Sequence, residues 1–369
     1  MEFTTNNRVA LYNRAKYMKR IFFLFLVLII CLSACGKTGN FQGDLERSQI
    51  GVMTTTDYQY NTSIQWFDDT LEETGRINFK YASMGSNFYS PIYQNGKYYV
   101  IPKGLSGRSD TKKVVGMDLK DMSIEEYPFT NISLSIAAVI ENTVYAINTL
   151  NFNSTIEAYD SKTKKSKSIV LEDVYVSSIT ASDNKLFCFV EDLQENASQK
   201  VCLKVYDKDL NLLYNTDVSD CGMTVGKYCE DEENLYFPIS ADKYDKFVGR
   251  LLTVNKKTYD FDVKELKEKF QNDIYLYQDK WIITNFDLVG NEGTKITVLT
   301  KDGDETVIDL GTDVSLSALY KDQLIIANDL MICAFSLDDY SLLHKHELET
   351  PKTDSNYCYT SALIIRDTP

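Results

Sequence analysis

The chain has 369 residues, of which 44% are hydrophobic and 25% charged, the composition of an ordinary globular protein. Its 25 Tyr and 18 Phe supply enough apolar surface to exclude a disordered chain, and six Pro and 17 Gly exclude collagen-like or low-complexity classes. A formal net charge of −14 argues against phosphate-backbone binding, which requires clustered Lys and Arg, so no nucleic-acid partner is expected.

The first predicted element in chain order is a secretory signal that begins at Met18. Lys19 and Arg20 form its positive end. The apolar run Ile21–Ile30 is too short for a transmembrane helix, which needs ~20 apolar residues. The sequence Leu32-Ser33-Ala34-Cys35-Gly36 follows and closely resembles the lipobox of bacterial lipoproteins. The residues before Met18 are polar and add nothing to such a signal, so Met18 is the predicted true start.

The resemblance to lipoproteins implies cleavage directly before Cys35 and a diacylglyceryl group on its thiol. It predicts a signal peptide over residues 1–34, a lipid-anchored tether over 35–48, and a location at the extracytoplasmic face of the cell membrane, with membrane lipid as a partner. An uncleaved signal anchor is the alternative. Five basic residues and one acidic residue precede Cys35, which leaves 34 basic and 52 acidic residues and a net charge of −18. Such a surface repels anionic lipids, so the acyl chains must hold the protein.

From about residue 49 to the end, hydrophobic residues recur with the period of two that is typical of β-strands. A polar turn pair followed by an apolar strand occurs six times, and the strands begin at Tyr98, Val144, Leu186, Leu235, Trp281 and Leu324. The intervals of 42 to 49 residues are typical of β-propeller blades. A strand–turn–strand motif follows each of these strands and also occurs earlier, over 64–77. Each unit therefore supplies four short strands.

The expected fold class is all-β: a β-propeller over residues 49–369, most simply with seven blades of four antiparallel strands. Six complete units run from about 88 to 349. The N-terminal segment has the outer strands of a further blade, and 356–366 supplies one leftover strand, so that pairing the two closes the ring and removes exposed sheet edges. Six or eight blades and a pair of β-sandwiches are the alternatives. A short helical signal over 262–270 predicts a connector.

The turn of the second motif resembles that of quinoprotein-like and YVTN-type repeat propellers. The resemblance is clearest over 158–171, and the equivalent turn position holds Asp68, Asp118, Asp160, Asp207, Asn255, Thr300 and Ser336. The signatures of WD repeats are missing, and two Trp cannot make the pattern of true quinoprotein dehydrogenases. The resemblance therefore implies an architecture and carries no activity.

Candidate binding residues lie in the loops between the second and third strands, which share one face of a propeller. Loops over 102–112, 149–154, 191–199, 240–246 and 286–294 are predicted to be long, whereas the last shrinks to 328–329. Loops on a rigid scaffold often carry binding sites, although loop length also drifts at little cost. The predicted ligand-binding residues on this rim are Lys103, Arg108, Phe152, Tyr244 and Phe286.

Neither a catalytic constellation nor a metal site is recognisable, so no enzyme activity, metal or cofactor is expected. His344 and His346 lie two apart on an outer strand without a third ligand and are expected to be solvent-facing. Acidic pairs such as Asp68-Asp69 lie in turns, where Asp is expected for backbone hydrogen bonding. The six cysteines after Cys35 are expected as buried free thiols, with a Cys188–Cys202 disulfide as the alternative.

The expected function is a membrane-anchored extracytoplasmic lipoprotein whose propeller is a non-enzymatic binding or scaffold module for an unknown protein partner or a cell-envelope glycan. One alternative is a cell-envelope polysaccharide hydrolase or lyase that uses carboxylates in the central channel, one of them with a raised pKa. Another is a sensory or immunity protein beside a neighbouring membrane complex.

Overall fold

The computed structural model describes residues 41–106, 111–192, 200–224, 226–349 and 357–366, which belong to one compact unit, Asn40–Pro369. These residues form 30 β-strands and no helix. Among them, no segment has the helical length and apolar character of a membrane span. Met18, Cys35 and the predicted signal peptide lie outside the described residues.

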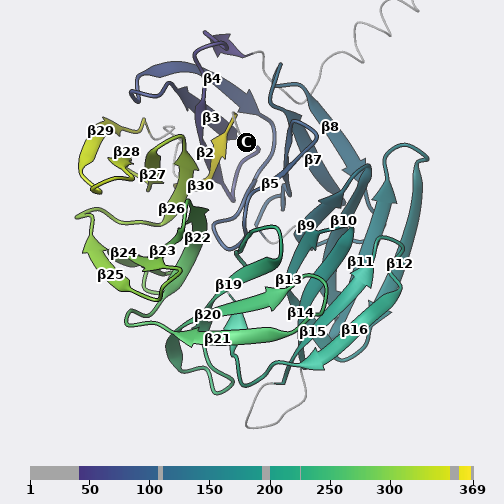
Figure 1. Ribbon diagram of the computed structural model, residues 1–369. Coiled ribbons are helices and arrows are strands. Elements are labelled where there is room, and N and C mark those ends of the chain that lie inside the picture. Colours follow the sequence, from purple (N-terminus) through teal and green to yellow (C-terminus); the bar gives the residue numbers. More distant parts are fainter. Residues whose placement is uncertain (1–40, 107–110, 193–199, 225, 350–356, 367–369) are drawn as a thin grey trace, which may run out of the picture. The chain divides into compact units, whose positions relative to one another are not determined.

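Seven antiparallel sheets surround a central axis, in agreement with the predicted seven-bladed propeller (Figure 1). The first strands of most neighbouring blades contact one another around the axis. Six blades are continuous in sequence, and their strands from the axis outward are β5 (Ile92–Gln94), β6 (Lys97–Val100), β7 (Lys113–Asp118) and β8 (Ile124–Pro128); β9 (Leu134–Ile140), β10 (Thr143–Leu150), β11 (Asn153–Asp160) and β12 (Lys165–Leu171); β13 (Val174–Ser182), β14 (Lys185–Asp192), β15 (Val201–Asp207) and β16 (Leu212–Asp217); β17 (Met223–Thr224) with β18 (Cys229–Glu230), β19 (Asn234–Ala241), β20 (Phe247–Asn255) and β21 (Phe261–Glu265); β22 (Gln271–Tyr277), β23 (Lys280–Asp287), β24 (Glu292–Thr300) and β25 (Glu305–Asp309); and β26 (Leu316–Tyr320), β27 (Gln323–Ala327), β28 (Met331–Ser336) and β29 (Leu342–Glu347).

The seventh blade joins the two ends of the chain. Its strands from the axis outward are β30 (Cys358–Ile365), β2 (Ile50–Thr56), β3 (Thr62–Phe67), β4 (Glu73–Phe79) and β1 (Gln42–Gly43). β30 pairs with β2 from Ile365 opposite Ile50 to Cys358 opposite Thr56, so the ring closes as predicted. Because β1 pairs with β4, the described chain joins the blade before the predicted boundary at 49.

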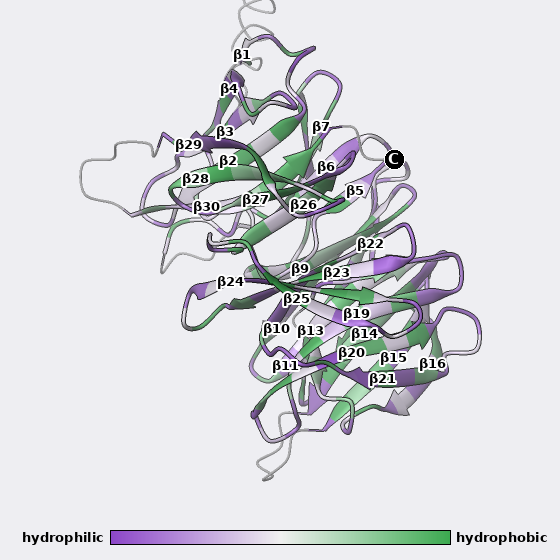
Figure 2. Ribbon diagram, turned by 60° about the vertical axis from the view of Figure 1, so that its left-hand side comes forward, coloured by the Kyte–Doolittle hydropathy of each residue, from purple (hydrophilic) through white to green (hydrophobic). Residues whose placement is uncertain are grey.

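The sequence pattern of each blade follows from the depth of its strands. Middle strands such as β3 are buried on both faces, whereas outermost strands such as β12, β16 and β29 are largely exposed. Figure 2 shows the same division, with hydrophobic residues within the blades and hydrophilic residues toward their edges. The helical prediction over 262–270 is wrong for this reason: β21 is an exposed outer strand, and its charged residues imitate a helix surface.

A side-chain oxygen closes the turn between the third and fourth strands of every blade. Asp68 Oδ1 accepts hydrogen bonds from the N–H groups of Thr70 and Glu72, each at 3.0 Å. The other six blades use the same position, which holds Asp118, Asp160, Asp207, Asn255, Thr300 and Ser336. The repeated residue is therefore a turn acceptor, which explains why Asp, Asn, Thr and Ser interchange there.

Several predicted long loops are shorter than expected because the strands continue into them. The prediction over 149–154 is wrong: β10 and β11 extend to Leu150 and Asn153, and Asn151 and Phe152 form a two-residue turn with φ values of 52° and 65°. In the same way β19, β20, β23 and β24 leave only 242–246 and 288–291 as loops. Residues 107–110 and 193–199, within two other predicted loops, lie outside the described residues.

The thiols follow the prediction except that Cys202 and Cys229 are only half-buried, whereas the histidines do not follow it. Cys188, Cys202, Cys221, Cys229 and Cys333 are free thiols, and Cys358 is buried. Burial raises the pKa of the Cys188 thiol and raises that of Cys221 to about 11, so both are poor nucleophiles at neutral pH.

His344 and His346 are half-buried rather than solvent-facing. The His346 ring meets Phe67 of the next blade edge-on, with ring centroids 5.1 Å apart, so it packs between blades. The described residues contain no group of three His, Cys, Asp or Glu side chains that could hold a metal ion.

Candidate functional site

The two ends of the ring differ in the connections they carry. The loops between second and third strands, and the connections between blades, share one end, which we call the loop face; it includes 57–61, 80–91, 242–246, 288–291 and 328–330. The tight turns between first and second and between third and fourth strands share the other end, the turn face. This assignment follows from the antiparallel order of every blade.

Large apolar side chains are exposed on the loop face. Of the seventeen exposed large hydrophobic side chains among the described residues, six lie on outermost strands: Val170, Leu212, Leu213, Phe261, Leu342 and Leu343. The other eleven lie in the connections of the loop face or beside them: Tyr58, Tyr60, Phe88, Ile132, Leu150, Phe152, Tyr244, Phe247, Val289, Leu330 and Tyr357. Beside the turns of the turn face lie five, all at the starts of outermost strands: Leu212, Leu213, Phe261, Leu342 and Leu343. Exposed apolar groups gathered on one face mark interaction surfaces.

Phe152 is the most conspicuous of these residues. It is 68% exposed and has a φ of 65°, a left-handed conformation that bulky side chains rarely adopt. The type I′ turn it occupies favours Asn-Gly, so a Phe there costs stability that a Gly would not. The turn thus holds an aromatic ring in solvent at the expense of local strain.

Two segments from non-neighbouring blades meet across the axis. One is the connection 80–91, which leads into β5, and the other lies between β17 and β18. Ser90 Oγ accepts a hydrogen bond from the Tyr228 N–H at 3.0 Å. Gly226 lies so close to Tyr89 that a Cβ there would be 2.6 Å from Tyr89 Cδ1. The axial channel is therefore crossed by chain rather than open.

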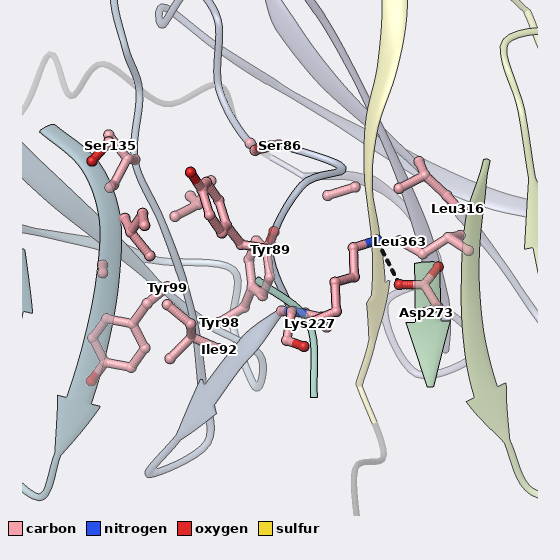
Figure 3. Close-up of a pocket in the computed structure, with 18 of the residues that line it drawn as sticks. Ser86, Tyr89, Ile92, Tyr98, Tyr99, Ser135, Lys227, Asp273, Leu316 and Leu363 are labelled. Atoms are coloured by element: carbon pink, nitrogen blue, oxygen red, sulfur yellow. Dashed lines mark hydrogen bonds and ion pairs between the residues drawn. The ribbon is translucent and has the colours of Figure 1, made fainter. Parts of the chain in front are cut away.

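A buried ion pair lies beside this crossing (Figure 3). Lys227 Nζ is 2.6 Å from Asp273 Oδ1, and their side chains are 3% and 6% exposed. Asp273 Oδ2 accepts hydrogen bonds from the Ser317 N–H at 3.1 Å and the Ser317 hydroxyl at 2.6 Å. Tyr275 adds a hydrogen bond from its hydroxyl to Ser317 O at 2.6 Å. Three neighbouring blades are thereby connected through one carboxylate.

The cavity around this pair is small. Its volume is about 70 Å³, which is room for roughly two waters at ~30 Å³ each and far less than the ~300 Å³ of a typical ligand pocket. Asp273 is the single carboxylate among the described residues that line it, and Lys227 holds that carboxylate. The two converging acids that the hydrolase hypothesis requires are not placed in this cavity.

Two larger hollows open on the loop face and share Phe88. The aromatic hollow, about 270 Å³, is lined by Phe88, Tyr89, Tyr175, Ser177, Thr224, Ser240, Phe247, Phe270, Gln271, Phe286, Asp287, Leu288 and Val289. The polar hollow, about 320 Å³, includes Asp57, Lys103 and Tyr359. Asp57 Oδ1 accepts hydrogen bonds there from the hydroxyls of Ser83 (2.6 Å) and Tyr359 (2.7 Å). Desolvation lowers the pKa of Lys103, and the nearby Asp57 carboxylate opposes this shift.

The structure disperses the sequence-predicted rim residues. Lys103 lines the polar hollow, and Phe286 is 2% exposed and lines the aromatic hollow. Phe152 and Tyr244 are exposed on the loop face, at 68% and 54%. Arg108 lies outside the described residues. Phe88, Phe247 and Gln271 were not among the predicted residues, since only the ring brings their loops together; the aromatic pattern Tyr244-x-x-Phe247 was the available signal.

No protein-family model and no curated protein matches the chain, but solved structures share its fold. The dihydro-heme d1 dehydrogenase NirN in complex with DHE matches with a TM-score of 0.53 and 11% identity over 88% of this chain and 76% of its own. Apo AztD from Citrobacter koseri has a TM-score of 0.52 and 7% identity, over 86% and 98%. A mutant apocarotenoid oxygenase from Synechocystis has a TM-score of 0.52 and 8% identity, over 88% and 95%. Such low identities show the propeller fold alone.

Proposed function

We propose that this chain is a membrane-anchored extracytoplasmic lipoprotein whose propeller is a non-enzymatic binding module, with the loop face as the surface for a protein partner or cell-envelope glycan. The observation that carries the proposal is the gathering of exposed apolar side chains on that face. Aromatic anchors surrounded by polar residues are the usual composition of a recognition surface. The strained Phe152 turn supports the same conclusion, because strain at an exposed ring is tolerated where the ring has a use.

The membrane anchor rests on the sequence around Cys35. Replacing the thiol in Cys35→Ser removes the acceptor of the diacylglyceryl group, so the variant is expected to leave the membrane fraction and to lose labelling by a clickable palmitate analogue. Ser33→Thr, which leaves Cys35 in place, is the control. Unchanged acyl labelling and membrane association of Cys35→Ser would contradict the anchor.

The binding face is tested in intact cells by chemical cross-linking and mass spectrometry of the purified lipidated protein. Wild type is compared with the variant Phe152→Ser/Tyr244→Ser, which removes two exposed rings from the loop face. The matched control is Phe261→Ser/Leu342→Ser, which removes two exposed apolar side chains, 39% and 52% exposed, from outermost strands. We expect the cross-linked species to be lost from the first variant and kept in the second. Equal retention in both variants would contradict the assignment of the face.

A further inference from the structure

The aromatic hollow is built from segments of several blades around the loop face. Phe88 and Tyr89 come from the connection before β5, Tyr175 from β13, Phe247 from β20, and Phe286 from β23. The Phe247 ring packs against that of Phe270 at a tilt of 50°, with ring centroids 4.7 Å apart, and Phe247 is 48% exposed. The walls therefore offer aromatic faces to whatever enters from solvent.

One buried polar group of this hollow is an acceptor that lacks a partner. Gln271 is 1% exposed; its Nε2 donates to Glu268 O at 2.5 Å, and its Oε1 accepts no hydrogen bond in the described structure. A buried acceptor without a donor costs about 1–3 kcal/mol, which a ligand N–H or O–H would recover. Gln271 thus points to a hydrogen-bond donor as the occupant.

One carboxylate lines the hollow, and a second lies behind a lining residue. Asp287 lines the hollow, and Glu191 interacts with the hydroxyl of Ser177, another lining residue. Among the described residues, neither carboxylate forms an ion pair, and no Lys or Arg lines the hollow. Burial raises the pKa of Glu191, and the neighbouring Asp245 raises it further, as expected for a carboxylate short of positive charge.

We propose that the aromatic hollow binds an organic cation, an alkylammonium group, between the faces of Phe247 and its aromatic neighbours, with Asp287 and Gln271 Oε1 as its polar partners. Aromatic rings attract such cations through their negative faces, and carboxylates complement the charge. The inference rests on the loop face being a binding surface and adds the chemistry of the group that it recognises. The net charge of −18 from Cys35 onward favours a cationic ligand in the same sense.

A neutral sugar is the competing occupant, because sugar rings also stack on aromatic side chains. A sugar-binding site would normally offer charged or amide donors as well as acceptors, whereas the charged and amide groups of this hollow present oxygen acceptors. The hydroxyls of Tyr175, Ser177, Thr224 and Ser240 are the side-chain hydroxyl donors among the described lining residues. The distribution of groups therefore favours a ligand that donates and carries positive charge.

The test uses the full lipidated protein in an uncharged polyoxyethylene detergent and saturation-transfer NMR. Choline is compared with 3,3-dimethylbutan-1-ol, which has the same shape without the charge. Nα-acetyl-lysine amide presents the same cationic chemistry in peptide form, and methyl glucoside is the neutral sugar. We expect choline or the lysine derivative to bind at least five-fold more tightly than the neutral isostere. Equal binding of the isosteres, a preference for the glycoside, or no binding would overturn the proposal.

Variants of the lining residues test whether the saturation-transfer signal comes from the aromatic hollow. Phe247→Leu keeps apolar volume but removes the ring, and Asp287→Asn removes one charge; each is expected to weaken cation binding at least five-fold. Phe261→Leu, on outermost strand β21, is the matched control and is expected to bind as wild type. Unfolding temperatures within a few degrees of wild type show that the variants fold. If the cation probes fail while cross-linking through Phe152 and Tyr244 persists, the cation site is wrong and the binding face stands.

Discussion

Replacing Lys227 by Met tests how the blades are held together at the axis. The substitution keeps the length of the side chain but removes the ammonium group that lies 2.6 Å from Asp273 Oδ1. Asp273 would then be a buried carboxylate whose remaining hydrogen bonds come from Ser317 alone. Removing one partner of a buried ion pair costs about 3–5 kcal/mol, because the other charge is left without compensation.

The expected shift in unfolding temperature follows from the size of the unit. An unfolding entropy of about 2.1 cal/mol/K per residue gives roughly 0.7 kcal/mol/K for the ~330 residues of Asn40–Pro369. A loss of about 3–5 kcal/mol therefore lowers the unfolding temperature by about 4–7 °C. The control is Lys295→Met, which breaks an exposed pair with Glu268 at 3.0 Å and is expected to cost below about 1 kcal/mol.

A second substitution separates loss of the ion pair from loss of packing. In Lys227→Met/Asp273→Asn, the neutral amide keeps an oxygen for the Ser317 donors, so the double variant is expected to recover at least about 2 kcal/mol of the loss. Thermal and urea unfolding of the three variants measure these differences. A double variant that is no more stable than Lys227→Met would refute the idea that the unpaired charge is the cause.

Three further predictions concern single residues. Phe152→Gly relieves a left-handed Phe and should raise the free energy of unfolding by about 0.5–1 kcal/mol in urea titrations while weakening partner binding; a loss of stability would contradict the strain. Since the folded-state pKa of Glu191 is raised, its neutral form is favoured, and stability falls as the pH rises from the ordinary Glu pKa through the folded value; Glu191→Gln should be more stable than wild type at pH 7 and equal to it at acidic pH. Cys221, whose pKa burial raises to about 11, should react with a thiol reagent at pH 8 far more slowly in the folded protein than in urea, and equal rates would show that it is accessible.

The repeat made the fold predictable. Each blade has its own turn acceptor and its own strands with alternating hydrophobic residues. The pattern therefore recurs along the chain and is recognisable in the sequence without knowledge of the three-dimensional ring. The C-terminal segment has one strand left over, at 358–365, and the N-terminal segment lacks an inner strand. Pairing the two completes the seventh blade and closes the ring. Strand ends were less predictable because residues such as Leu150 and Asn153 are polar or exposed although they continue the ladder.

The contents of the axis and of the aromatic hollow could not be predicted in the same way. Lys227 and Asp273 belong to neighbouring blades, and only the packing of these blades around the axis brings their charged atoms within 2.6 Å. The one available signal was the charged residue in an inner strand, as in Asp273-Ile274-Tyr275, because a buried carboxylate requires a positively charged or hydrogen-bonding partner. Gln271 gives no sequence signal at all, since its unpartnered oxygen is a property of the packed structure.

Site-specific photo-cross-linking in intact cells tests the loop face most directly. The photoreactive amino acid p-benzoylphenylalanine replaces Tyr244 or Phe152 on the loop face and, in matched proteins, Phe261 on an outermost strand, so each substitution exchanges one exposed aromatic ring for another. The proposed function predicts one defined adduct from positions 244 and 152 and none from 261. Adducts of equal yield from all three positions, or from 261 alone, would contradict the loop face as the binding surface.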